Sequence, residues 1–128
     1  MSTNRNERKE IKMTRDDLMQ AAMQIIMHAG DAREANVEAL DLAADGNFQN
    51  AREKWEKASE EIVIAHRIQT DSIQDEIRED TPAEHSLLFT HAQDTLMTIN
   101  SEILLTGKIL NSFEKLNQRL EAIENKLK

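Results

Sequence analysis

Apolar residues recur at helical spacing in three long segments of this 128-residue chain. The first series is Leu18, Ala22, Ile25, Ala29, Ala32, Leu40 and Ala43, the second is Phe48, Ala51, Trp55, Ala58, Ile62 and Ala65, and the third is Leu88, Ala92, Leu96, Ile99 and Ile103. Steps of three and four residues return to one face of an α-helix, so each series marks a packing face. The pattern predicts helices over about residues 15–44, 48–78 and 82–126.

Capping signals bound these segments. Thr14-Arg-Asp-Asp17 has the form of a capping box at the start of the first helix. Asp45-Gly46 predicts its end, because Gly takes the left-handed closing conformation without a Cβ penalty, and Asn47 can cap the second helix. Thr81-Pro82-Ala83-Glu84 predicts the start of the third helix, with Pro at its first position. Gly107 lies inside the third pattern, where a lone Gly is tolerated.

Composition agrees with an all-α chain. Three Gly, one Pro and 3% aromatic residues argue against a sheet, and the absence of Cys excludes disulfides and thiolate zinc sites. The sequence therefore predicts an antiparallel three-helix bundle in a single domain, residues 14–128, preceded by a disordered N-terminal extension, residues 1–13. No apolar run approaches the roughly 18 residues of a membrane span, so we expect a cytoplasmic protein without direct membrane insertion.

The net charge of −8 is concentrated in the middle of the chain. Both ends carry more Lys and Arg than Asp and Glu, which leaves the acidic excess on residues 18–106. Nucleic acids bind basic surfaces, so this distribution excludes nucleic acid as an expected partner and favours a basic protein instead.

Two apolar surfaces indicate assembly into an oligomer. Met19, Met23, Ile26 and Met27 lie beyond the first stripe, and they could contact another subunit or fill a wide intramolecular core. The last helix carries a coiled-coil series of Ile109, Phe113, Leu116, Leu120, Ile123 and Leu127. In the heptad repeat of a coiled coil, Leu at a positions with Ile at d positions favours three or four strands. Arg119 and Glu124 fall at the g and e positions that flank this apolar seam. The same series could instead belong to the core of the bundle itself.

His91 and Asp94 are a polar pair on this otherwise apolar helix. Three residues rotate by about 300°, so the two side chains lie about 60° apart on adjacent turns. A neutral imidazole is a nucleophile near neutral pH, so His91 could accept a phosphoryl group. It could also bind a metal with Asp94, provided that symmetry supplies further ligands, or serve as a hydrogen-bonded structural histidine.

The segment His91-Ala-Gln-Asp-Thr-Leu-Met97 resembles the active-site signature of the lactose/cellobiose-type enzyme IIA of the bacterial sugar phosphotransferase system. Ala29-Gly-Asp-Ala-Arg33, Asp45-Gly-Asn-Phe48 and the segment from Ala65-His to Gln69-Thr70 resemble the same family in the same order. The resemblance covers about residues 14–110. Asp31 and Arg33 could alternatively form a buried pair between helices.

The resemblance implies a homotrimeric phosphocarrier. His91 would take a phosphoryl group from the carrier HPr and pass it to a IIB component during uptake of a disaccharide such as cellobiose or lactose. Asp94 would face the threefold axis, where three copies hold one Mg²⁺, a hard cation suited to carboxylates. Gln93, Thr95 and His66 would support the phosphate, although Gln93 could be a surface residue and His66 a packing residue.

Thr95 departs from the family pattern, which usually has a second histidine there. Any assistance that a second imidazole gives to phosphoryl transfer is therefore lost here, or is given by the Thr95 hydroxyl instead. A non-catalytic trimeric regulator or scaffold with the same fold is accordingly the alternative function.

Overall fold

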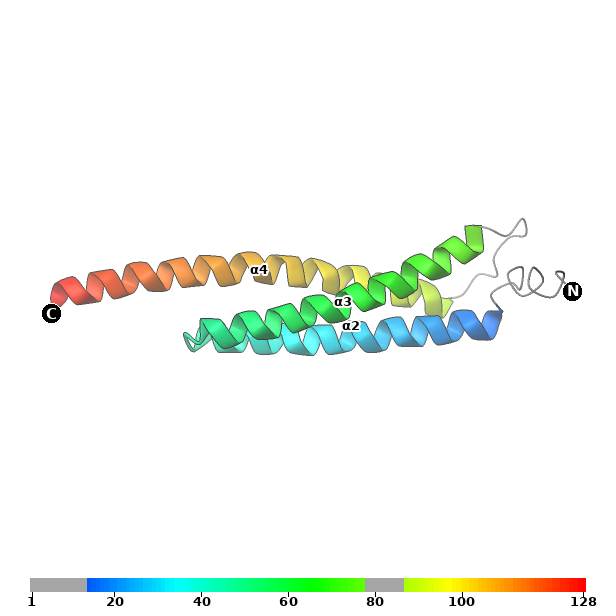
Figure 1. Cartoon of the computed structure of the whole chain (residues 1–128), viewed down its shortest axis with the longest axis horizontal. Coiled ribbons are helices and arrows are strands. Elements are labelled where there is room, and N and C mark those ends of the chain that lie inside the picture. The colour runs from blue at the N-terminus through cyan, green and yellow to red at the C-terminus, as the bar shows by residue number, and fades with distance from the viewer. Residues whose placement is uncertain (1–13, 78–86) are drawn as a thin grey trace, which may run out of the picture.

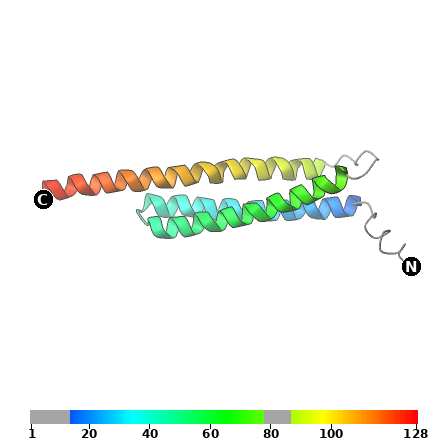
Figure 2. The ribbon, with the colours of Figure 1, turned by 45° about the horizontal axis from the view of Figure 1, so that its top comes forward.

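Three long helices make up the computed structural model of the protein, which describes residues 14–77 and 87–128 (Figure 1). They are α2 (Arg15–Ala44), α3 (Phe48–Ile77) and α4 (Leu87–Leu127). α2 and α3 form an antiparallel pair, and α4 lies along this pair and runs in the direction of α2 (Figures 1 and 2). The predicted all-α architecture with a long C-terminal helix is confirmed. The expected extension at 1–13 and the Thr81-Pro82 start signal lie outside the described residues.

The start of α2 and the glycine turn after it follow the predicted signals. Thr14 Oγ1 accepts a hydrogen bond from Asp17 N at 3.1 Å, and Asp17 Oδ2 accepts one from Thr14 N at 3.0 Å. These bonds complete the capping box and satisfy two backbone donors at the start of α2. Gly46 has a φ of 82°, and its N–H donates to the carbonyl of Ala43 at 3.0 Å. The left-handed glycine therefore turns the chain from α2 into α3.

The core combines many alanines on α2 and α3, with Leu18, Ile25 and Ile62 among them, and larger side chains on α4. The buried apolar residues of its main cluster include Ala22, Ala29 and Ala32 of α2, Ala58 and Ala65 of α3, and Leu96, Ile99 and Ile103 of α4. Small side chains allow helices to approach closely, and the branched side chains of α4 fill the space that remains. Leu40, a predicted core residue, is only half-buried, whereas its neighbour Ala39 is fully buried.

Trp55 fixes the position of α4 against α3. Its ring is half-buried between the two core clusters, and its Nε1 donates a hydrogen bond to the Ile103 carbonyl at 2.7 Å. Its Cζ2 lies 2.8 Å from the point where a Cβ on Gly107 would stand. The lone glycine within α4 thus provides the space that the indole occupies.

The two apolar surfaces that could have belonged either to an oligomer contact or to the core are exposed in the single chain. Met19, Met23 and Met27 expose 41%, 62% and 58% of their surface, so the wide intramolecular core is wrong for them, and only Ile26 packs against the core. The apolar series at the end of α4 is also exposed from Phe113 onward, so it is not part of the bundle's own core. The core face of α4 passes instead through Ile103, Thr106 and Leu110. Among the described helices, none is long and apolar enough to cross a membrane.

Candidate functional site

His91 stands on the surface of α4 directly beside the core. Its side chain is exposed, whereas Phe89, Ala92 and Leu96 around it on the helix are buried. These buried neighbours hold the backbone at position 91 rigidly against α2 and α3. No hydrogen bond to another described residue fixes the tautomer of the imidazole, so either ring nitrogen could accept an incoming group.

The residues that follow His91 occupy different surroundings. Asp94 is exposed, whereas Gln93 and Thr95 are half-buried. The Thr95 hydroxyl donates a hydrogen bond to the His91 carbonyl at 2.8 Å, the usual local bond of a threonine to the backbone four residues earlier. Its proton is therefore engaged by the helix, and the hydroxyl could donate to a phosphate only after this bond is broken, for example by rotation of the proton about the Cβ–Oγ1 bond.

Asp94 lies on the outward face of α4, where it is accompanied by exposed apolar side chains. Met97, Leu104 and Leu105 expose 47%, 64% and 62% of their surface. Within residues 14–77 and 87–128, no three His, Asp or Glu side chains come together closely enough to hold a metal ion. One chain therefore offers a single carboxylate here, and a metal site at Asp94 would require carboxylates from further copies.

His66 lies on α3, the helix on the other side of the same core. Its side chain is exposed, and its carbonyl accepts a hydrogen bond from the Thr70 hydroxyl at 2.9 Å. Ala65 beside it and Ala92 beside His91 belong to the same core cluster, so both histidines border one core. No hydrogen bond between described residues joins His66 to His91.

Arg33 pairs with α4 and not with its neighbour in the motif. Its guanidinium donates two hydrogen bonds to the Glu102 carboxylate, at 2.7 Å and 3.1 Å. The side chains of Arg33 and Glu102 are 49% and 41% exposed. The alternative that Asp31 and Arg33 form a buried pair between helices is therefore wrong. The guanidinium of Arg33 lowers the pKa of Glu102 through this bond. The pair joins α2 to α4 three turns beyond His91, and so helps to position the helix that carries the site.

His28 has a structural role that its sequence context did not indicate. Its Nδ1 lies 2.7 Å from Glu61 Oε2, and both side chains are about three-quarters buried. This contact joins α2 to α3. The two residues are 33 positions apart, and no local pattern could pair them before the hairpin was known.

Comparison with known proteins assigns this three-helix arrangement to a class of phosphocarriers. A family model described as the lactose/cellobiose-specific IIA subunit of the phosphotransferase system matches residues 20–114. The lichenan-specific enzyme IIA component of Bacillus subtilis is 35% identical over 104 residues, which cover 81% of this chain and 94% of that protein.

Solved structures show the same fold. The cellobiose-specific enzyme IIA of Bacillus anthracis superposes with a TM-score of 0.73 at 37% identity, covering 83% of this chain and 94% of the other. The IIA component of the Escherichia coli N,N'-diacetylchitobiose branch, solved in complex with HPr, superposes with a TM-score of 0.67 at 29% identity. It covers 78% of this chain and 96% of that one.

The chain belongs to the lactose/cellobiose family of phosphotransferase-system IIA components. It is a phosphotransferase that acts through a phosphohistidine.

Proposed function

We propose that His91 is the histidine that carries the phosphoryl group, received from phospho-HPr and delivered to a IIB component. The observation that carries this proposal is the exposed imidazole of His91, which lies on a helix anchored by its buried neighbours. A ring nitrogen forms a bond to phosphorus as the bond between phosphorus and the donor breaks, and the same exchange runs in reverse towards IIB. Positioning of the two partners supplies much of the rate in such a transfer.

The partner proposed for the first transfer is HPr. The solved Escherichia coli relative in complex with HPr supports this choice. The net charge of −8 suits a partner with a basic rim around its phosphorylated residue. Attraction between exposed charges is screened by salt, so we expect the rate of encounter to fall as ionic strength rises.

Transfer to His91 is tested with phosphoenolpyruvate, enzyme I and HPr. We expect an acid-labile, base-stable phosphate on the protein that is absent from His91→Ala. His28→Ala is the control, because it removes a histidine that pairs with Glu61 between α2 and α3 and is not one of the proposed supporting groups. Label retained by His91→Ala would assign the carrier to another histidine, and no label on the unaltered protein would favour the regulatory alternative.

Gln93, Thr95 and His66 are the proposed supporting groups for the phosphate. The bond from the Thr95 hydroxyl to the His91 carbonyl makes Thr95 the most informative of these to change. If the hydroxyl supports the phosphate, Thr95→Val should slow transfer while changing stability by less than about 1 kcal/mol, because it removes one local hydrogen bond of a half-buried side chain. Equal rates for Thr95→Val and the unaltered protein would remove Thr95 from the site.

Assembly as a homotrimer about α4 completes the proposal. Asp94 stands among the exposed side chains of Met97, Leu104 and Leu105, a surface suited to contact with other copies. Three such carboxylates meeting on an axis would repel one another, so one Mg²⁺ per trimer, held by Asp94 of each copy, would neutralise them. The ion would supply charge neutralisation at the interface and take no part in the transfer.

The metal site is tested by elemental analysis of the purified oligomer. One Mg²⁺ for every three chains is expected in the unaltered protein and none in Asp94→Leu, which should remain trimeric. Asp41→Leu removes an exposed carboxylate from α2 and should keep the metal. Equal metal content in all three proteins would refute the axial site.

The substrate of the complete system is proposed to be a disaccharide such as cellobiose or lactose. Relatives described as specific for lichenan, cellobiose and N,N'-diacetylchitobiose share 35%, 37% and 29% identity with this chain. Phosphoryl transfer from this protein to purified IIB components of each specificity would identify the partner, and the productive component names the sugar.

A further inference from the structure

The end of α4 projects beyond the turn between α2 and α3 (Figures 1 and 2). Leu110 is the last buried residue of this helix. Arg52 of α3 donates hydrogen bonds to Asn111, at 3.0 Å, and to Glu114, and these are the last hydrogen bonds that join α4 to the other described helices. Residues 115–127 continue as helix for about 20 Å, and none of them is buried by the described part of the chain.

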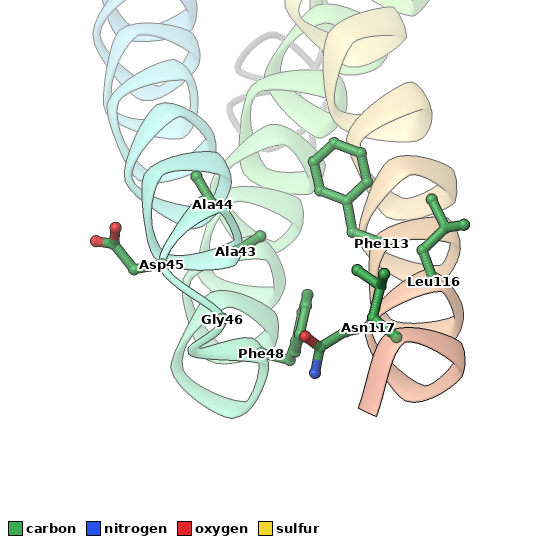
Figure 3. Close-up of a pocket in the computed structure, with 9 residues that line it drawn as sticks. Ala43, Ala44, Asp45, Gly46, Phe48, Phe113, Leu116 and Asn117 are labelled. Atoms are coloured by element: carbon green, nitrogen blue, oxygen red, sulfur yellow. The ribbon is translucent and has the colours of Figure 1, made fainter. Parts of the chain in front are cut away.

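This projecting segment carries a continuous apolar stripe, which we call the tail stripe. It consists of Phe113, Leu116, Leu120, Ile123 and Leu127, which are 43%, 51%, 55%, 55% and 82% exposed. At its base a groove of about 360 Å³ lies between the stripe and the α2–α3 turn, with Phe48 on one side and Phe113 on the other (Figure 3). A helical segment of this length is marginal in water unless its apolar face is buried.

We propose that the tail stripe forms a parallel three-stranded coiled coil with the tail stripes of two other copies of this chain, an inference that rests on the trimer proposed above. Phe113, Leu120 and Leu127 occupy a positions, and Leu116 and Ile123 occupy d positions. Leu at a with Ile at d favours three or four strands over two. The family model matches residues 20–114, so every residue of the tail stripe except Phe113 lies beyond the matched segment.

The exposed face of α4 runs without interruption from the proposed axis to the tail stripe. Asp94, Leu105, Leu116 and Leu127 follow one another at intervals of 11 residues, and all four are exposed. Eleven residues return to nearly the same face of a straight helix. Three copies that bring their Asp94 side chains together would therefore also bring their tail stripes together.

Charges beside the stripe select the parallel orientation. Arg119 and Lys126 occupy g positions, and Glu124 occupies an e position. Parallel strands place Arg119 of one copy near Glu124 of the next, which is an attractive pair. Antiparallel strands would instead set g positions against g positions and Glu124 against Glu124, so every such pair would be repulsive.

The proposal is tested on the full chain by measuring its oligomeric mass over a range of concentrations. Leu120→Glu with Ile123→Glu should raise the concentration at which the trimer dissociates by at least about tenfold, because three strands each lose two buried side chains. The matched control is Gln118→Glu with Asn125→Glu, which adds the same charge on the opposite face of the same turns. It should change the midpoint by less than about twofold.

A charge exchange provides a second, independent measurement. Glu124→Arg should weaken the trimer, and Arg119→Glu combined with Glu124→Arg should restore it, because the attractive pair is then rebuilt with its signs reversed. Far-UV circular dichroism identifies any variant that fails to fold. A monomeric unaltered protein, an unchanged midpoint in Leu120→Glu with Ile123→Glu, or no restoration in the charge exchange would each overturn the proposal.

Phosphorylation of His91 separates this inference from the carrier function. The tail stripe lies more than five turns along α4 from His91, so tail variants that are still trimeric should be labelled like the unaltered protein. If the unaltered protein is not labelled but the tail substitutions dissociate it, the carrier proposal fails and the coiled coil stands. If the unaltered protein is labelled normally but the tail substitutions leave the dissociation midpoint unchanged, the coiled coil fails and the carrier proposal stands.

Discussion

Gly107→Ala is expected to destabilise the bundle even though alanine is the better helix former. The new Cβ would lie 2.8 Å from Trp55 Cζ2, 3.1 Å from its Cε2 and 3.4 Å from its Nε1. Ordinary contact between carbon atoms begins near 3.4 Å, so the ring would have to shift by about 0.6 Å. The indole is rigid, and its Nε1 is held by the Ile103 carbonyl at 2.7 Å. Movement away from the glycine would therefore strain this hydrogen bond.

The magnitude follows from three contributions. Overpacking of a well-packed site costs about 1–3 kcal/mol, and a weakened hydrogen bond adds up to about 1 kcal/mol. Replacing Gly by Ala within a helix returns about 1 kcal/mol. These contributions give a net loss in the free energy of unfolding between about 0 and 3 kcal/mol, with a middle value of about 1.5 kcal/mol.

Gly30→Ala is the matched control, because Gly30 also lies inside a helix but has no atom within 4 Å of its missing Cβ. It should stabilise the protein by about 0.5–1 kcal/mol, so the two variants should differ by about 2–3 kcal/mol. Urea unfolding followed by circular dichroism and by tryptophan fluorescence, at one protein concentration, measures both values.

A double-mutant cycle assigns the loss to the indole. In a Trp55→Phe background the smaller ring leaves room for the Cβ, so Gly107→Ala should become neutral or stabilising. Equal stabilisation by Gly107→Ala and Gly30→Ala in the unaltered background would refute the argument, since it would show that the ring yields without cost.

Three further substitutions test other local features by the free energy of unfolding in urea. Thr14→Ala should cost about 1 kcal/mol through loss of the capping box, and an unchanged stability would show that the start of α2 is frayed. Gly46→Ala should cost about 1–2 kcal/mol because of its φ of 82°, and Gly46→Asn less; equal values would argue against a left-handed turn. Arg33 lowers the pKa of Glu102 below its ordinary value of 4.5, so this pair should stabilise the protein above that pH and lose its effect as pH falls through the lowered pKa. Glu102→Gln should therefore cost less than about 1 kcal/mol at neutral pH, given the exposure of both partners, and nothing in acid; a loss that persists in acid would contradict the ion-pair argument.

Features that depend on neighbours along the chain were predictable from the sequence. The helix spacing, the Thr14–Asp17 capping box and the left-handed Gly46 are settled within a few residues, because backbone conformation and local hydrogen bonds decide them. The His91 motif was also recognisable by local spacing, as its side chains share adjacent turns of one helix. The family assignment is confirmed by the comparisons.

Only the tertiary structure decided which distant residues meet. His28 pairs with Glu61, Arg33 pairs with Glu102, and Trp55 reaches the Ile103 carbonyl, each across two helices. Helical periodicity specifies a face but not the rotation and offset of one helix against the next. The bundle set that offset by packing alanines against the branched residues of α4, and this packing also left the methionines of α2 and the end of α4 exposed. Periodicity alone could not distinguish those surfaces from core, because a face that will be buried by the same chain and one that is left exposed on it have the same apolar spacing.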